Sequence, residues 1–203
     1  PYQTMIFMGG TGSFSQRPSD TERQLQSFNR VENMLRGGRA VLFPLWAGSY
    51  ERSDGYSVMG SLAPAWREKT VQWVKELNQS IDYLETRDDI DADRIGFQGV
   101  SFGAAMSPVL LAMEPRLKTA VLNGGGFFAI SAEIGDFPPE IDPATYAPRV
   151  TASVLMMNGR YDAIFPYESS QVPFFEALGT PESQKKHLTY PSGHSSYGWN
   201  MEY

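Results

Sequence analysis

Short apolar runs alternate with longer amphipathic stretches along this chain. The runs are four to six residues long and tend to be followed by Gly or Pro, which favours strands over helices. They occupy residues 4–8, 40–45, 95–98, 117–122, 152–157 and 186–190. Between them the sequence predicts helices, from helical spacing of apolar positions or from segments that are apolar nearly all round. These helices cover residues 20–36, 66–87, 102–113 and 167–178.

This alternation is typical of an α/β protein with a mostly parallel sheet of about six strands, covered by helices on both faces. Ligands bind such sheets at the carboxyl ends of the strands, so functional residues are expected just after the apolar runs. No linker divides the chain, and we expect a single domain over residues 1–203. The one long irregular stretch, residues 124–150, is expected to form a small cap over the site.

The composition narrows the function classes. A chain of 203 residues with 41% hydrophobic residues can build one core of ordinary size. No apolar run approaches the roughly 18–20 residues that span a bilayer, so no membrane span is expected. The net charge of −6 and the lack of a basic run argue against nucleic-acid binding. The absence of cysteine excludes thiol catalysis and cysteine-ligated metals, and no metal or cofactor is predicted.

The ends of the chain suggest that it belongs to something longer. The first residues already resemble a core strand, so we expect further sequence before Pro1 and after Tyr203, with this domain as the C-terminal part of a longer protein. No signal-peptide pattern is visible, and a cytoplasmic location is expected. Sheet edges left open by absent strands would allow two chains to pair, so an oligomer is compatible with the pattern.

Residues 99–103, Gly-Val-Ser-Phe-Gly, match the motif G-x-S-x-G. The motif alone is weak evidence, but here it follows a predicted strand and opens a predicted buried helix. That context is typical of a nucleophile elbow, in which a strained turn exposes the serine hydroxyl above the sheet. Ser101 is therefore the candidate nucleophile. The alternative is a Gly-rich turn in which Ser101 only caps the helix.

Two histidines are available to activate a serine hydroxyl. His187 lies inside the predicted strand at residues 186–190 and is expected to be an ordinary strand residue. His194 follows that strand in the loop Pro-Ser-Gly-His-Ser, at the carboxyl end of the sheet. We therefore predict His194 as the base, with a turn-stabilising histidine as the alternative.

A carboxylate is then needed to orient the imidazole and to stabilise its charged form. Asp162 follows the run at residues 152–157 and gives the chain order Ser, Asp, His. Asp136 and Asp142 precede that run, on the wrong side of it for this role, and Glu168 is a further rival. The alternative role for Asp162 is to cap a helix.

An oxyanion hole requires two N–H donors that are already in place. One is expected from the backbone of Phe102, directly after the nucleophile. The second is expected from the Gly-Gly-Thr-Gly loop at residues 9–12, from either Gly10 or Thr11, because glycine lets the backbone approach a substrate closely. A plain turn or a phosphate loop is the alternative, although the loop lacks the third glycine and the lysine of those motifs.

Six aromatic residues are expected near the mouth of this site, where they would line an apolar pocket for the acyl or alcohol group. The alternative for each is packing of the cap onto the sheet. They are Trp46, Tyr50, Phe127, Phe128, Tyr161 and Phe165.

Three segments carry a family resemblance: DADRIGFQGVSFGAA around Ser101, NGRYDAIFP around Asp162 and SGH at His194. Together they resemble the α/β-hydrolase family, particularly its dienelactone-hydrolase-like and prolyl-oligopeptidase-like branches, and are similar to bacterial acetyl-xylan-esterase-type domains. The resemblance implies that the six strands match the third to the eighth of the family sheet. The chain departs from many relatives in having Met8 where they have histidine in the oxyanion loop.

The residues and the resemblance predict a serine hydrolase of the carboxylesterase type, which cleaves a small-molecule carboxylic ester through an acyl-enzyme intermediate. A peptidase or amidase with the same three residues is the second hypothesis, less favoured in a chain without a propeller-like domain. The third is a non-catalytic sensing or interaction domain of a multidomain protein. A complete Ser, His and Asp set argues against it, because the fold alone does not require those residues.

Overall fold

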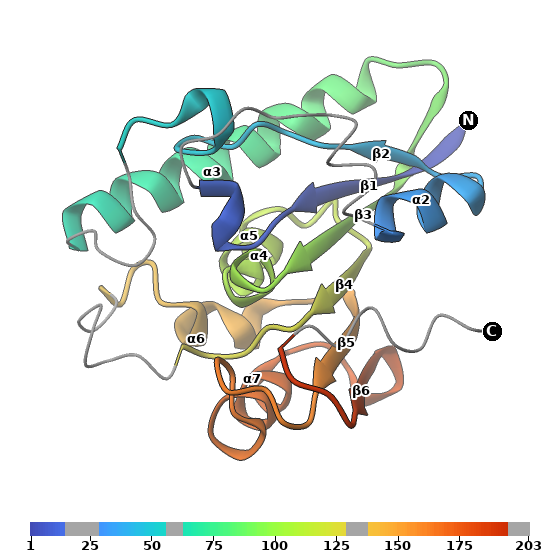
Figure 1. Ribbon diagram of the computed structural model, residues 1–203. Coiled ribbons are helices and arrows are strands. Elements are labelled where there is room, and N and C mark those ends of the chain that lie inside the picture. The colour runs from blue at the N-terminus through green and yellow to red at the C-terminus, as the bar shows by residue number, and fades with distance from the viewer. Residues whose placement is uncertain (15–28, 56–62, 129–137, 195–203) are drawn as a thin grey trace.

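The structure is a computed structural model that describes residues 1–14, 29–55, 63–128 and 138–194. Within these residues, six strands form one parallel sheet in the order β2-β1-β3-β4-β5-β6 (Figure 1). The prediction of an α/β fold with about six parallel strands is confirmed. The strands are β1 (Tyr2–Met8), β2 (Ala40–Leu42), β3 (Ile90–Val100), β4 (Thr119–Asn123), β5 (Ser153–Gly159) and β6 (Lys185–Tyr190).

Two strands differ in length from the prediction. β2 ends at Leu42 rather than residue 45, and Pro44, which has no backbone N–H to donate to a neighbouring strand, lies just beyond it. β3 begins at Ile90, ahead of the predicted apolar run, because Ile90 pairs with Tyr2 of β1 across a register shift. Residues 90–94 of β3 are largely exposed and mostly polar, so no apolar pattern in the sequence indicated this part of the strand.

The helices lie on both sides of this sheet. The β1–α2–β2 crossover moves to one edge and the later crossovers move toward the other, so right-handed connections place α2 on the face opposite the remaining helices (Figure 1). On that other face, α5 contacts both α3 and α6. The helices are α2 (Asn29–Arg36), α3 (Ala63–Glu85), α4 (Phe102–Ala105), α5 (Ser107–Met113), α6 (Pro143–Tyr146) and α7 (Val172–Ala177).

Two predicted helices are interrupted. The segment 102–113 divides at Met106 into α4 and α5, with Pro108 in the first turn of α5. The segment 167–178 starts as a π turn, η4 (Tyr167–Gln171), before α7, whose first turn holds a proline. Proline is compatible with the start of a helix but not with its interior, which accounts for both divisions. Of the helix predicted at 20–36, residues 20–28 lie outside the described residues.

The buried face of helix α3 matches the expected one in its C-terminal half, at Leu77, Ile81 and Leu84, and differs in its N-terminal half. The spacing of Val71, Val74, Leu77, Ile81 and Leu84 predicts that these residues share one buried face, but Val71 is 46% exposed, whereas Trp73 is fully buried. Positions 66, 70, 73, 77, 81 and 84 form the face that packs on the sheet, a spacing of three or four residues. On this face the Trp73 indole N–H donates to the Ala47 carbonyl and fastens α3 to the loop that follows β2.

The segment 124–150 is described only in part. Residues 138–150 form α6 and the turn η3 (Ala147–Arg149), which pack against α5 with Ile141 and Ala147 buried. Residues 129–137 lie outside the described residues, so the cap over the site stays a prediction. Of the helices described, none is long and apolar enough to cross a membrane.

Candidate active site

Ser101 occupies a strained turn between β3 and α4. Its φ of 52° and ψ of −111° lie where residues with a side chain are rarely found. The flanking glycines permit this turn because neighbouring backbone atoms leave no room for a side chain. A Cβ on Gly99 would lie 2.6 Å from the carbonyl oxygen of Gly103, and one on Gly103 would lie 2.3 Å from that of Met8. The turn therefore presents the Ser101 side chain at the carboxyl end of the sheet, as an elbow does.

Three side chains meet at this edge in a continuous chain of hydrogen bonds. Ser101 Oγ lies 2.9 Å from His194 Nε2, and His194 Nδ1 lies 2.8 Å from Asp162 Oδ2. Ser101 follows β3, Asp162 follows β5, and His194 follows β6. The structure thus brings together the three residues that the sequence singled out, from three separate strand ends.

The Asp162 carboxylate is closed off from solvent and fully engaged. Its second oxygen, Oδ1, accepts the backbone N–H groups of Ile164 and Phe165 at 2.8 and 3.1 Å, and its side chain is 0% exposed. Burial raises the pKa of this carboxyl. The hydrogen bonds from His194 and from the Phe165 and Ile164 backbone outweigh that effect, so the pKa of Asp162 lies below its ordinary value. The group is therefore ionised at neutral pH.

Backbone hydrogen bonds hold the histidine loop against the end of β5. Arg160 N–H donates to the Tyr190 carbonyl at 2.7 Å, and Tyr161 N–H donates to that of Ser192 at 3.0 Å. Gly159 makes this contact possible, because a Cβ there would lie 2.0 Å from the carbonyl oxygen of Gly193. The loop that carries His194 and the turn that carries Asp162 are consequently one packed unit.

The predicted oxyanion loop lies directly against the elbow. The carbonyl of Gly9 accepts the N–H of Gly103 at 3.1 Å, and a Cβ on Gly10 would lie 3.2 Å from Cβ of Ser101. Thr11 opens the 3-10 turn η1 (Thr11–Phe14), and Phe102 is the first residue of α4. N–H groups at such positions have no partner within their own helix. Backbone donors from both segments therefore lie beside Ser101.

The six aromatic candidates divide into three groups. Trp46 and Tyr50 belong to the loop after β2 and are each 2% exposed, so their burial favours a supporting role over direct contact with a substrate. Tyr161 is 73% exposed. Phe165 lies 5.9 Å from the His194 ring, Phe128 lies 5.5 Å from Phe165, and the half-buried Phe127 packs on α7.

The rival residues lie elsewhere or serve other roles. His187 is within β6 and interacts with Asn158 Oδ1 at 3.2 Å. Asp142 caps α6 by accepting the N–H of Ala144. Glu168 has a side chain that is 82% exposed and pairs with Arg160. Asp136 lies outside the described residues.

Two buried amides escaped the sequence-based reasoning. Gln171 Nε2 donates to the carbonyls of Gly159 and Phe165 at 2.9 and 2.7 Å, so it ties the two ends of the turn that contains Asp162. Asn158 Nδ2 donates to the Gly125 carbonyl at 2.7 Å and joins the ends of β4 and β5. Asn158 carried a weak signal, as a polar residue at the end of an apolar run, whereas Gln171 lies in an amphipathic segment that offered none.

Over residues 1–14, 29–55, 63–128 and 138–194, no group of three or more His, Asp or Glu side chains is placed to hold a metal ion. The acidic and imidazole groups nearest Ser101 are instead engaged with one another, as described above.

A parallel sheet with a serine on a strained strand-to-helix turn, and with acid and histidine at later strand ends, defines the α/β-hydrolase class. The sequence profile of the dienelactone hydrolase family matches residues 27–195, and the chain belongs to that family. The resemblance noted from the motifs is thereby confirmed. Among proteins with curated functions, the comparison finds no match.

Solved structures share this fold at low sequence identity. Acetyl xylan esterase 1 from Thermoanaerobacterium sp. JW/SL YS485 is 19% identical, with a TM-score of 0.68 over 95% of this chain and 69% of its own. A cold-adapted esterase from an Arctic intertidal metagenomic library is 21% identical, with a TM-score of 0.66 over 97% and 76%.

Acylaminoacyl peptidase from Pyrococcus horikoshii is 19% identical, with a TM-score of 0.64, and 96% of this chain matches 33% of that much longer one. At these identities the structural likenesses speak for the fold. Together with the family match, they support a serine hydrolase kind of function.

Proposed function

We propose that this protein is a serine hydrolase that cleaves a small-molecule carboxylic ester, with Ser101 as nucleophile, His194 as base and Asp162 as the residue that orients His194. The observation that carries the proposal is the unbroken chain from Ser101 Oγ to His194 Nε2 at 2.9 Å and from His194 Nδ1 to Asp162 Oδ2 at 2.8 Å. A serine hydroxyl becomes a competent nucleophile at neutral pH when such a base accepts its proton.

In the first half of the reaction, Ser101 Oγ attacks the ester carbonyl carbon and passes its proton to His194 Nε2. The tetrahedral intermediate collapses as the carbon–oxygen bond to the alcohol breaks, and the leaving oxygen takes the proton from Nε2. In the second half, water attacks the acyl group on Ser101 and gives a proton to His194. The carboxylic acid then leaves as Oγ recovers its proton.

Asp162 stabilises the imidazolium that forms in each half of this cycle. Because its pKa is below the ordinary value, the carboxylate remains ionised and accepts a hydrogen bond from the Nδ1–H group of His194, which keeps its proton. That hydrogen bond keeps Nε2 directed at Ser101, in the tautomer that accepts a proton. The backbone donors of Ile164 and Phe165 fix the carboxylate, so the imidazole has a rigid partner.

Backbone N–H donors are assigned to stabilise the negative charge that develops on the carbonyl oxygen. Phe102 N–H is one, and an N–H in the Gly10–Thr11 segment is the other. Donors of this kind contribute strongly because they are oriented before the charge appears. The partly buried Phe128, which packs on the buried Phe165 beside His194, supports an apolar surface for the acyl or alcohol group.

Ester turnover tests the proposal. The protein is incubated with p-nitrophenyl esters of increasing acyl length and, separately, with a peptide p-nitroanilide. We expect turnover of the esters, and a loss in Ser101→Ala of roughly 10⁶-fold in kcat, the scale of loss when a hydrolase nucleophile is removed. Ser169→Ala, at an exposed serine, is the matched control and should leave kcat unchanged.

Turnover that persists in Ser101→Ala would overturn the assignment of the nucleophile. Faster cleavage of the anilide than of every ester would instead place the protein with the peptidases and amidases. Labelling of the wild-type protein, but not of Ser101→Ala, by a fluorophosphonate gives an independent readout of the nucleophile.

A further inference from the structure

Tyr50 adopts a backbone conformation that tyrosine rarely takes. Its φ is 47°, and among the described residues Ser101 is the other non-glycine with positive φ. Side chains clash with the backbone in this region, so such a residue persists where its surroundings hold it there. Both strained positions follow strands that pair with β1, with Ser101 directly after β3 and Tyr50 in the loop after β2.

The Tyr50 side chain is held from two directions. It is 2% exposed, and its ring lies 6.0 Å from Phe43, which in turn stacks on Phe7 of β1 at 5.2 Å. Its hydroxyl donates to Ser13 Oγ at 3.0 Å. With its backbone in this conformation, Tyr50 in the loop after β2 extends its hydroxyl into the loop after β1.

Ser13 connects this hydroxyl to the backbone beside the nucleophile. The Ser13 N–H donates to the Gly10 carbonyl at 2.9 Å and closes the turn that begins at Thr11. Its Oγ also lies against Gly9, where a Cβ would come within 2.3 Å of it. Ser13, which accepts the Tyr50 hydrogen bond, therefore contacts both Gly9 and Gly10, the residues that pack against the elbow.

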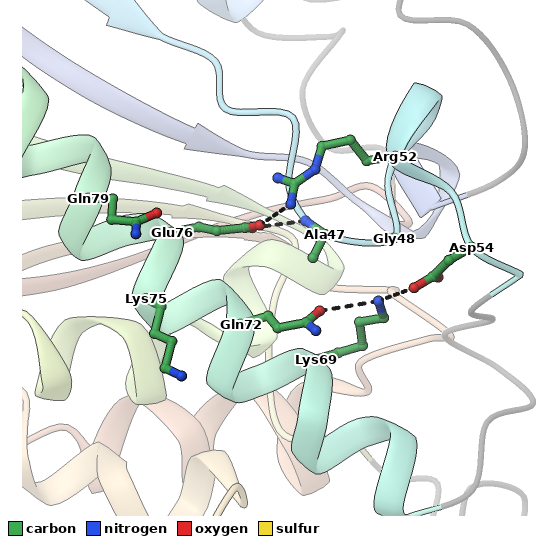
Figure 2. Close-up of a pocket in the computed structure, with 9 residues that line it drawn as sticks. All are labelled: Ala47, Gly48, Arg52, Asp54, Lys69, Gln72, Lys75, Glu76 and Gln79. Carbon is green, nitrogen blue, oxygen red and sulfur yellow. Dashed lines mark hydrogen bonds and ion pairs between the residues drawn. The ribbon is translucent and has the colours of Figure 1, made fainter.

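The loop that carries Tyr50 is itself braced against α3, as Figure 2 shows. Glu76 accepts the N–H of Ala47 at 2.8 Å and pairs with Arg52 at 2.5 Å, while Lys69 pairs with Asp54. These side chains border a pocket of about 390 Å³. Because these four side chains already pair with one another across the loop and the helix, their role is to hold the loop in place.

Two indoles complete the bracing from within. Trp46 Nε1 donates to the Phe7 carbonyl at 3.0 Å, and Trp73 Nε1 donates to the Ala47 carbonyl at 2.9 Å. One bond fastens the loop to β1 and the other fastens it to α3. A continuous path of buried contacts therefore runs from α3 through the loop to the Tyr50 hydroxyl.

We propose that Tyr50 is a positioning residue, which sets the Gly9–Thr11 backbone through Ser13 so that its N–H faces the oxyanion. This inference rests on the proposed function, because it concerns the same reaction at the same serine. It predicts that the Tyr50 hydroxyl acts on the transition state and hardly on the bound substrate, because the charge on the oxygen develops as the carbonyl is attacked.

The test removes either end of the hydrogen bond. Tyr50→Phe keeps the ring and loses the hydroxyl, and Ser13→Ala removes the acceptor. We expect each to lower kcat for p-nitrophenyl acetate by about tenfold with KM nearly unchanged, less than the roughly 10²–10³-fold loss of an oxyanion donor itself. The double variant should lose no more than the larger single loss, since both changes break one interaction.

Three safeguards keep the result interpretable. Active sites are titrated with a fluorophosphonate, so kcat refers to folded, reactive Ser101. Rates are measured well below the melting temperature of each variant. Tyr83→Phe is the matched control, because the Tyr83 hydroxyl accepts a hydrogen bond from Arg87 on the exposed side of α3, and it should leave kcat unchanged.

The outcomes separate the two claims. Unchanged kcat in Tyr50→Phe and Ser13→Ala, in a wild-type protein whose turnover depends on Ser101, overturns the positioning role and leaves the proposed function standing. A rise in KM at constant kcat, or additive losses in the double variant, also overturns it. A wild-type protein with no Ser101-dependent turnover overturns the proposed function, and the positioning role with it.

Discussion

The two histidines of this chain lie seven residues apart and occupy contrasting surroundings. His187 is held in β6 between the rings of Tyr167 and Phe175, at 5.9 and 5.4 Å, and burial lowers its pKa. His194 lies beyond the end of the strand, between a hydroxyl and a buried carboxylate. Burial without an acid partner favours the neutral form of an imidazole, whereas an imidazole beside a carboxylate can accept a proton during a reaction.

Hydrogen-bond partners, more than exposure, distinguish a structural histidine from a candidate base in this protein. Both rings are at least partly buried, and both have an aromatic neighbour. The difference is that His187 meets an amide oxygen, that of Asn158, whereas His194 meets a carboxylate. The same substitution at each position therefore tests the contrast directly.

The largest effect is expected from replacing His194. His194→Gln should lower kcat for a p-nitrophenyl ester by roughly 10⁶-fold, because nothing remains to accept the Ser101 proton. His187→Gln is the matched control, and its kcat should stay within about twofold of wild type, since its ring contacts neither Ser101 nor Asp162. Comparable losses from the two substitutions would erase the distinction between the histidines.

A smaller loss is expected at the carboxylate. Asp162→Asn should lower kcat by about 10⁴-fold with a modest change in KM, because the amide no longer fixes the imidazole in the tautomer that accepts a proton. Glu168→Gln provides the comparison, since Glu168 is a rival carboxylate that is exposed and paired with Arg160. A greater loss at Glu168 than at Asp162 in steady-state assays would reverse the assignment.

The smallest effect concerns stability and involves His187 alone. Because burial lowers its pKa below the ordinary 6.5, the unfolded chain binds the proton more readily than the folded one. The stability associated with neutral His187 is therefore present above pH 6.5 and is lost as the pH falls below it. Asp162 does not contribute in this window, because its pKa lies below 3.8.

Thermal melting at pH 7.5 and pH 5.5 measures this contribution. Wild type should lose more melting temperature over that interval than His187→Gln, and each kcal/mol of difference corresponds to about 2–4 °C for a chain of this size. Equal losses in the two proteins would show that His187 is not the group whose protonation is disfavoured by folding.

Much of this site was predictable, because its signals are local. The elbow is encoded by five consecutive residues, 99–103, and its position after an apolar run indicated where Ser101 would lie. Asp162 and His194 were located by a rule of parallel sheets, which places the ends of successive strands at one edge. With two histidines in the chain, the choice of His194 then depended on a strand boundary that the structure matches.

The parts that escaped prediction depend on contacts between distant segments. Tyr50 and Ser13 are 37 residues apart, and neither belongs to a motif, so nothing local indicates their hydrogen bond. The burial of Trp73 in place of Val71 reflects packing against the loop after β2, whose carbonyl at Ala47 receives the indole. Such choices are settled by tertiary packing, which overrides the periodicity of a single helix.

The distance along the chain between Ser101 and His194, 93 residues, links activity to the completion of folding. Bringing such remote segments together costs loop entropy that is recovered when the intervening strands have paired. Under the proposed mechanism, ester turnover therefore depends on the pairing of four neighbouring strands, from β3 to β6. A fragment that ends before β6 would retain the strained serine and its glycines but would have no base, so a gain of activity on refolding would mark the arrival of the last strand.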